Sequence, residues 1–116
     1  MRVLVIEDSP TQQEMIVRAI KKAGSEPVSA DRWGLVINTV MEKPDLVIAD
    51  WNVPDKIEHR NRSIAILEKM KIPFVILTAY FSDVPERLQK FAVAKAVDIE
   101  KQVSDILARV ASGVEI

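Results

Sequence analysis

Three short apolar runs, each followed at once by a polar or acidic residue, constrain the fold of this 116-residue chain more than any other feature. The runs cover residues 3–6, 46–49 and 74–77, are rich in Val, Ile and Leu, and do not alternate with polar residues. Strands that are apolar on both faces are typical of a parallel sheet covered by helices on both sides. The runs therefore predict three central strands of such a sheet.

Segments with helical periodicity separate these runs. The first of them begins with a Ser9-Pro10 cap, carries Gln12 three positions after the cap, and has a stop signal at Gly24. Four further helices are expected over residues 33–42, 60–70, 82–92 and 103–111, and two weaker strands over 28–30 and 96–99. Five strand–helix units joined by right-handed crossovers predict an α/β fold with a doubly wound, parallel, five-stranded sheet.

Composition excludes several classes of function. The chain has no Cys and one His, which removes thiol chemistry, Cys-based zinc sites and most His-ligated metal sites. Its net charge of -1 creates no positive field that would attract nucleic acid. Its apolar runs are far shorter than the roughly 20 residues that span a bilayer, and the N-terminal run is too short for a signal peptide. We therefore expect one cytoplasmic domain over residues 1–116, without direct nucleic-acid binding or membrane insertion.

Acidic and polar residues follow the predicted strands at the edge where a doubly wound sheet binds its ligands. Glu7 and Asp8 follow the first run, Asp50 the second and Thr78 the third. Neighbouring carboxylates repel one another, and a bound cation relieves that repulsion. Because the donors are all oxygens, the pattern predicts Mg²⁺, with the backbone carbonyl of Asn52 as a further ligand.

Asp50, at a strand end beside a metal, is a candidate nucleophile because a carboxylate can attack phosphorus and form an aspartyl phosphate. Phosphoryl transfer needs mainly positioning and charge neutralisation. The Thr78 hydroxyl can donate a hydrogen bond to a phosphoryl oxygen, and the Lys101 ammonium, just past the predicted last strand, can offset its charge. Lys95 precedes that strand in this interpretation, so we expect it on the surface.

These residues lie in motifs that resemble the receiver domains of two-component response regulators. The matching segments, spread over the whole chain, are VLVIED at residues 3–8, PDLVIADWNVP at 44–54, VILTA at 75–79 and the single Lys101. The resemblance implies a flavodoxin-like (βα)5 fold with strand order 2-1-3-4-5. It also implies a signalling module, which is not an enzyme.

The same resemblance assigns roles to the residues at the sheet edge. Glu7 and Asp8 bind Mg²⁺. Asp50 accepts a phosphoryl group from a sensor histidine kinase or a phosphotransfer protein. Thr78 senses that group and Lys101 pairs with it. The output passes to a downstream protein target, or to an effector domain missing from this chain, through protein contacts.

Three departures from the receiver pattern keep alternatives open. Gln102 follows the lysine where receivers carry a cis proline, Asp98 replaces an aromatic residue that moves on phosphorylation, and residues 51–62 contain no glycine. A pseudo-receiver that binds a partner without phosphorylation is one alternative. A flavodoxin-like flavin or nucleotide binder is another, although acids stand where its phosphate cradle would be. An aspartate-nucleophile phosphatase is the third, and its usual second acid is here Asn52.

Overall fold

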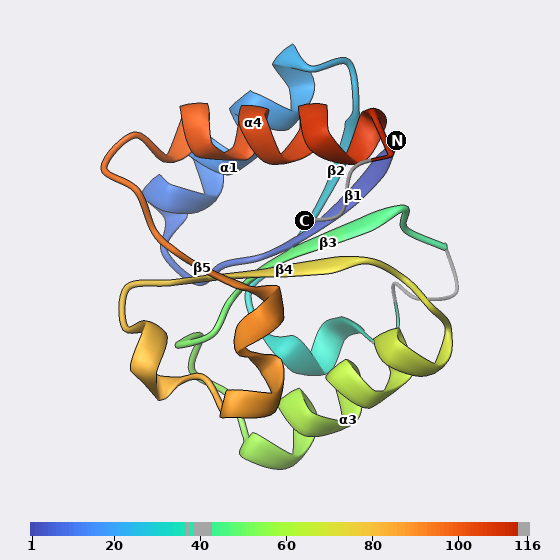
Figure 1. Ribbon diagram of the computed structural model, residues 1–116, viewed down its shortest axis with the longest axis vertical. Helices are drawn as coiled ribbons and strands as arrows, with labels where there is room; N and C mark the ends of the chain where they lie inside the picture. The colour runs from blue at the N-terminus through green and yellow to red at the C-terminus, as the bar shows by residue number, and fades with distance from the viewer. Residues whose placement is uncertain (37, 39–42, 114–116) are drawn as a thin grey trace.

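The computed structural model describes residues 1–36, 38 and 43–113, which form a five-stranded parallel sheet with helices on both faces (Figure 1). The strands are β1 (Arg2–Ile6), β2 (Glu26–Ala30), β3 (Leu46–Asp50), β4 (Phe74–Thr78) and β5 (Ala92–Ala94). The α-helices are α1 (Pro10–Lys22), α3 (Ile57–Lys69) and α4 (Ile99–Ala111), and the 3₁₀ helices are η1 (Trp33–Leu35), η2 (Phe81–Asp83) and η3 (Glu86–Phe91). The strand order β2-β1-β3-β4-β5 confirms the predicted α/β class and the 2-1-3-4-5 order.

The central strands are buried on both faces, as their unalternating composition predicts. Within β1, Val3 and Val5 face a core shared with α1 and α4, whereas Leu4 and Ile6 face a core shared with α3 and η1. Figure 1 shows the same division, with α1 and α4 on one side of the sheet and α3 on the other. The acids that follow the strands therefore project from a rigid, well-packed edge.

Helix α1 begins and ends where the sequence predicts. Ser9 is its N-cap, with its hydroxyl oxygen accepting a hydrogen bond from Gln12 N at 3.4 Å, and Pro10 occupies the first turn. Gly24 follows the C-terminus with φ +80°, a conformation that glycine adopts without strain. This cap places the first turn of α1 directly after the acids at the end of β1.

The predicted helix over 33–42 is described only in part. Residues 33–35 form the short η1, Val36 and Asn38 are α-helical, and Val36 is buried. Ile37 and Val40, which helical spacing predicts to face inward, lie outside the described residues. Helix α3 begins at Ile57, three residues before the predicted start. Helical spacing over this segment predicts Ile64 and Leu67 in the core, and both are buried.

The region after β4 departs most from prediction. The expected helix over 82–92 is instead the pair η2 and η3, because Pro85 has no N–H and keeps Val84 extended (φ -79°, ψ 129°). The last strand is β5 at Ala92–Ala94, so the prediction of a strand over 96–99 is wrong. Asp98 is the N-cap of α4, its side chain accepting from Lys101 N at 3.0 Å.

In the described part of the chain, no helix has both the length and the apolar character that crossing a bilayer demands.

Candidate functional site

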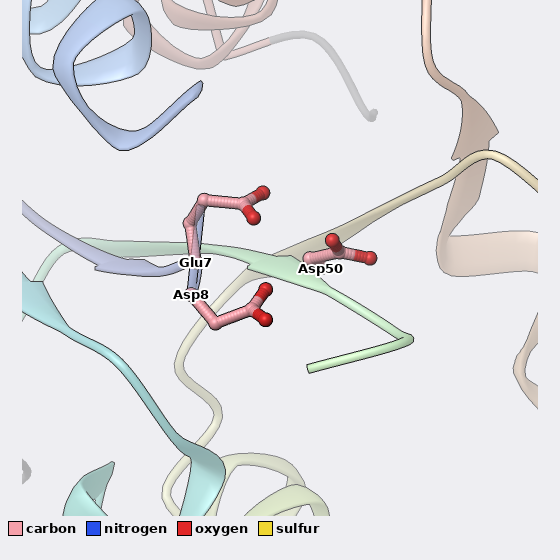
Figure 2. Close-up of side chains that lie close together, drawn as sticks. All are labelled: Glu7, Asp8 and Asp50. Carbon is pink, nitrogen blue, oxygen red and sulfur yellow. The ribbon is translucent and has the colours of Figure 1, made fainter. Parts of the chain in front are cut away.

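Three acids meet at the carboxyl edge of the sheet. β1 and β3 are adjacent and in register, so Glu7 and Asp8, which follow β1, lie beside Asp50 at the end of β3. One carboxylate oxygen from each residue lies within 4.8 Å of the others, and Figure 2 shows the three side chains close together at the ends of β1 and β3. Glu7 is 2% exposed and Asp50 9% exposed. The predicted convergence of the acids is confirmed.

Lys95 completes this site. Its ammonium donates to Asp50 Oδ2 at 2.9 Å, to Glu7 Oε2 at 3.1 Å and to Gln12 Oε1. A lysine ammonium has three donors, so all of them are used here. The Lys95 side chain is 12% exposed, and its charge offsets part of the repulsion among the acids.

Burial and neighbouring charge change the acidity of two of these groups. Burial raises the pKa of Glu7, and the charge of Asp50 adds to that rise, although hydrogen bonds from Ser9 N and Lys95 partly oppose it. Burial alone would lower the pKa of Lys95, but the hydrogen bonds and charges of Asp50 and Glu7 outweigh it and raise the pKa. The lysine is therefore held in its charged form beside the two carboxylates.

The prediction that Lys101 lies at the end of the last strand is wrong. Lys101 lies in α4 with a 74% exposed side chain, and its ammonium is 3.3 Å from Asp105 Oδ2. Lys95, which we expected on the surface, directly follows β5, and its backbone N–H bonds to Thr78 O. Because η2 and η3 replace the predicted full helix, β5 and the lysine that follows it occur earlier in the sequence than predicted. The apolar run at residues 91–94, just before Lys95, is the sequence signal for β5, but it is too short to mark a strand by itself and overlaps the helix predicted over 82–92.

Because Lys95 and not Lys101 lies at the site, the residues that must be compared with the receiver pattern also change. Ala96 now follows the lysine and Ala92 lies three residues before it, so neither Gln102 nor Asp98 stands at the place assigned to it. Neither alanine is a proline or an aromatic residue, and all peptide bonds among the described residues are trans. The chain therefore still lacks the proline after the lysine and the aromatic residue three positions before it.

Asp50 and Thr78 lie on neighbouring strands, with Asp50 paired to Leu77 in the register of β3 and β4. Asp50 Oδ1 accepts a hydrogen bond from Asn52 N at 3.0 Å, which orients the carboxylate. Thr78 is fully buried, and its Oγ1 accepts from Tyr80 N at 3.1 Å and from Asn52 Nδ2 at 3.5 Å. The predicted site residues other than Lys101 are thus gathered at one edge.

The backbone carbonyl of Asp50 accepts a hydrogen bond from a side chain on the α3 side of the sheet. The Trp33 indole N–H donates to Asp50 O at 3.1 Å. Trp51 is buried, packs edge-on against Trp33, and carries the Arg60 guanidinium 3.7 Å above its ring. His59 lies in α3 with Nδ1 3.0 Å from Asp55 Oδ1. These contacts make the strand end rigid, as a preorganised site requires.

The donor set fits a hard divalent cation. Three carboxylates that each offer an oxygen within 4.8 Å of the others form the all-oxygen environment that Mg²⁺ and Mn²⁺ prefer. The site combines this cation site with an ammonium and a buried hydroxyl, groups that bind the oxygens of a phosphoryl group.

No family model matches the sequence. The chain is 33% identical over 84 residues to the phosphate regulon transcriptional regulatory protein PhoB of Escherichia coli (strain K12), which covers 67% of this chain and 35% of PhoB. It has the same identity over 81 residues to PhoB of Klebsiella pneumoniae. The chain spans about a third of the length of the curated relatives it matches.

Solved structures share the fold, among them that of the response regulator Rcp1. The BeF3-activated conformation of SdrG from Pseudomonas melonis Fr1 matches with a TM-score of 0.75 and 23% identity over 94% of each chain. The Mn(2+)-bound form of response regulator Rcp1 matches with a TM-score of 0.71 and 20% identity, over 99% of this chain and 97% of Rcp1. With the similarity to PhoB, the strand order and the acidic edge, these matches show that the chain belongs to the receiver domains of response regulators.

Proposed function

We propose that this receiver domain accepts a phosphoryl group on Asp50 in a reaction that depends on Mg²⁺. The observation that carries the proposal is the meeting of Glu7, Asp8 and Asp50 with the ammonium of Lys95 at one edge of the sheet. Two structural neighbours are consistent with it, since one is the BeF3-activated conformation of SdrG and the other is the Mn(2+)-bound form of Rcp1.

The acids and the backbone carbonyl of Asn52 would hold the metal ion. A bound Mg²⁺ neutralises charge on the phosphoryl oxygens and orients them. The other roles in the reaction belong to side chains and backbone groups of this chain. Asn52 N holds Asp50 Oδ1, which keeps the carboxylate aimed at the phosphorus. The Lys95 ammonium, 2.9 Å from Asp50 Oδ2, and the Thr78 hydroxyl, which accepts from Asn52 and still has its own hydrogen to donate, would bind phosphoryl oxygens.

In the transfer step, a carboxylate oxygen of Asp50 attacks the phosphorus of a phosphohistidine on a sensor kinase or a phosphotransfer protein. A new oxygen–phosphorus bond forms as the phosphorus–nitrogen bond breaks, and the bonding electron pair returns to the imidazole of the donor. The product is an aspartyl phosphate whose charge lies beside Lys95.

The output of the domain runs through contacts with another protein or with an effector domain. The relative PhoB is named a transcriptional regulatory protein and is longer than this chain, which is consistent with a receiver that controls a separate functional unit. Receivers of this class are signalling modules, and we place this one in the cytoplasm, where a sensor kinase would reach it.

The decisive test is incubation with Mg²⁺ and a small acyl phosphate, followed by intact mass measurement. We expect the wild type to gain one phosphoryl group and Asp50→Asn to gain none, because the amide is not a nucleophile. An equal gain on Asp50→Asn would place the acceptor elsewhere. No gain on the wild type would instead support the pseudo-receiver, the alternative that binds partners without phosphorylation.

The same assay distinguishes the two lysines. We expect Lys95→Met to slow phosphorylation by about tenfold or more, because a charge-assisted hydrogen bond beside the reacting carboxylate is lost. Lys101→Met serves as the matched control and should react at the wild-type rate, since its exposed ammonium pairs with Asp105. A loss confined to Lys101→Met would contradict the assignment of Lys95.

A further inference from the structure

Two glutamines from different helices hold Lys95, one at its ammonium and the other at its backbone. Gln12, in the first turn of α1, contacts its ammonium. Gln102, in α4, contacts the backbone on both sides of it. From this geometry we propose that Gln12 and Gln102 are positioning residues that hold Lys95 against Asp50.

Gln12 is the uncharged acceptor among the three that the ammonium contacts. Its backbone is fixed by the cap, since Gln12 N donates to Ser9 Oγ, and its Oε1 accepts from the Lys95 ammonium. Glu7 and Asp50, the other two acceptors, also belong to the acidic cluster. Gln12 therefore holds the ammonium at the site without drawing on the oxygens that the cluster offers to a cation.

Gln102 acts on the backbone. Its Nε2 donates to Ala94 O at 2.8 Å, and its Oε1 accepts from Ala96 N at 3.0 Å. The amide thus bridges the two residues that flank Lys95, whose own N–H bonds to Thr78 O at 2.9 Å. β5 has three residues and lies at the edge of the sheet, so its end has few other constraints.

These two sets of hydrogen bonds matter because lysine has a long, flexible side chain whose ordering is entropically costly. With the backbone held from α4 and the ammonium held from α1, Lys95 is placed next to Asp50 before any phosphoryl donor arrives. Preorganisation of this kind raises the rate of a reaction without adding a group that touches the reacting atoms.

The test compares Gln12→Met and Gln102→Met with Gln89→Met. Gln89 is a matched control because its Nε2 also donates to a backbone carbonyl, Val84 O, away from Lys95. The first measurement is the ¹⁵N NMR signal of the Lys95 ammonium in metal-free protein, assigned by its loss in Lys95→Arg. The second is hydrogen exchange at the Ala96 amide. The third is the rate of phosphorylation by an acyl phosphate.

In the wild type we expect a slowly exchanging Lys95 signal. Gln12→Met should broaden or abolish that signal and slow phosphorylation by about tenfold, the effect of losing one hydrogen bond to a charged group. Gln12→Glu, which keeps an acceptor oxygen, should restore the signal. Gln102→Met should speed exchange at Ala96 by about tenfold and also slow phosphorylation. Gln89→Met should leave all three measurements unchanged.

The proposal is overturned by a wild type without a protected Lys95 signal. It is also overturned if Gln12→Met and Gln102→Met, shown by circular dichroism to be folded, leave the signal and the Ala96 exchange unchanged. The kinetic part rests on the proposed function, but the two NMR measurements do not. If they change as expected while the wild type takes no phosphoryl group, the positioning of Lys95 stands and phosphorylation of Asp50 fails.

Discussion

At the scale of single residues, Asp55 links the loop after Asp50 to a segment distant in sequence. Its carboxylate accepts hydrogen bonds from Gly34 N and Lys56 N, both at 2.7 Å, and lies 3.0 Å from His59 Nδ1. A Cβ at position 34 would lie 3.2 Å from His59 Nδ1, so glycine permits this close approach. Burial alone would raise the pKa of Asp55, but these hydrogen bonds outweigh it and lower the pKa.

This lowered pKa predicts how the contribution of Asp55 to stability depends on pH. A carboxyl with a lower pKa in the folded state stabilises that state above its unfolded pKa, and loses the effect as pH falls through the folded value. We expect Asp55→Asn to lower the free energy of unfolding near neutral pH, with a difference from wild type that shrinks below about pH 4. Urea unfolding at a series of pH values measures it.

Asp105→Asn is the control for that series, because Asp105 is exposed and pairs with Lys101 on the same helix face. It should change the free energy of unfolding by less than about 0.5 kcal/mol at every pH. A difference for Asp55→Asn that stays constant from neutral pH to pH 3 would contradict the interpretation of Asp55.

At the scale of elements, one buried hydroxyl joins α3 to η1. Ser63 is fully buried in α3, and its Oγ lies 2.8 Å from both Trp33 O and His59 O. Trp33 in turn donates to the backbone carbonyl of Asp50. The serine therefore supports the segment that braces the end of β3.

We expect Ser63→Ala to lower the free energy of unfolding by about 0.5–1.5 kcal/mol, because one buried hydrogen bond is lost while Val36 N still donates to the carbonyl of Trp33. Ser112→Ala is the matched control. Its hydroxyl bonds back to Ala108 O in the same way, but it is exposed and has no hydrogen bond to a second element in the described part of the chain. Chemical denaturation of both variants measures the difference. Equal effects would show that the contact with η1 contributes nothing.

At the scale of the whole molecule, the acidic edge links cation binding to stability. Three carboxylates within 4.8 Å of one another favour the folded state less than neutral groups would, and Lys95 offsets part of this cost. A cation that binds the folded chain stabilises it by mass action, by about 2.7 kcal/mol at a concentration 100 times its dissociation constant. For a domain of this size, that predicts a rise in melting temperature of roughly 10 °C.

We therefore expect Mg²⁺ to raise the melting temperature of the wild type, and Asp8→Asn to remove most of that rise. Asp8→Asn should also melt slightly higher than wild type without Mg²⁺, because one repelling charge is gone. Differential scanning calorimetry with and without Mg²⁺ measures both effects. Asp45→Asn is the control, since Asp45 precedes β3 and accepts from Arg2 N at the other edge of the sheet. A full Mg²⁺ response in Asp8→Asn would argue against this cation site.

The patterns that predict structure correctly here are local ones. Unalternating apolar runs mark β1, β3 and β4, the Ser9-Pro10 cap marks the start of α1, and the acids adjoin the runs they follow. Each of these signals lies within a few residues of sequence and depends on backbone geometry and burial alone. The sheet and its acidic edge could therefore be inferred before any coordinates.

The identity of the lysine was decided only by the tertiary structure. The three residues of β5 form too short a run to mark a strand, and Pro85 turns the preceding segment into 3₁₀ helices, so position along the chain was a poor guide to position at the site. Gln12 is 83 residues from Lys95 in sequence. Gln12 contacts Lys95 because the strand order brings the start of α1 and the end of β5 together at the carboxyl ends of the strands, and no local pattern encodes that order.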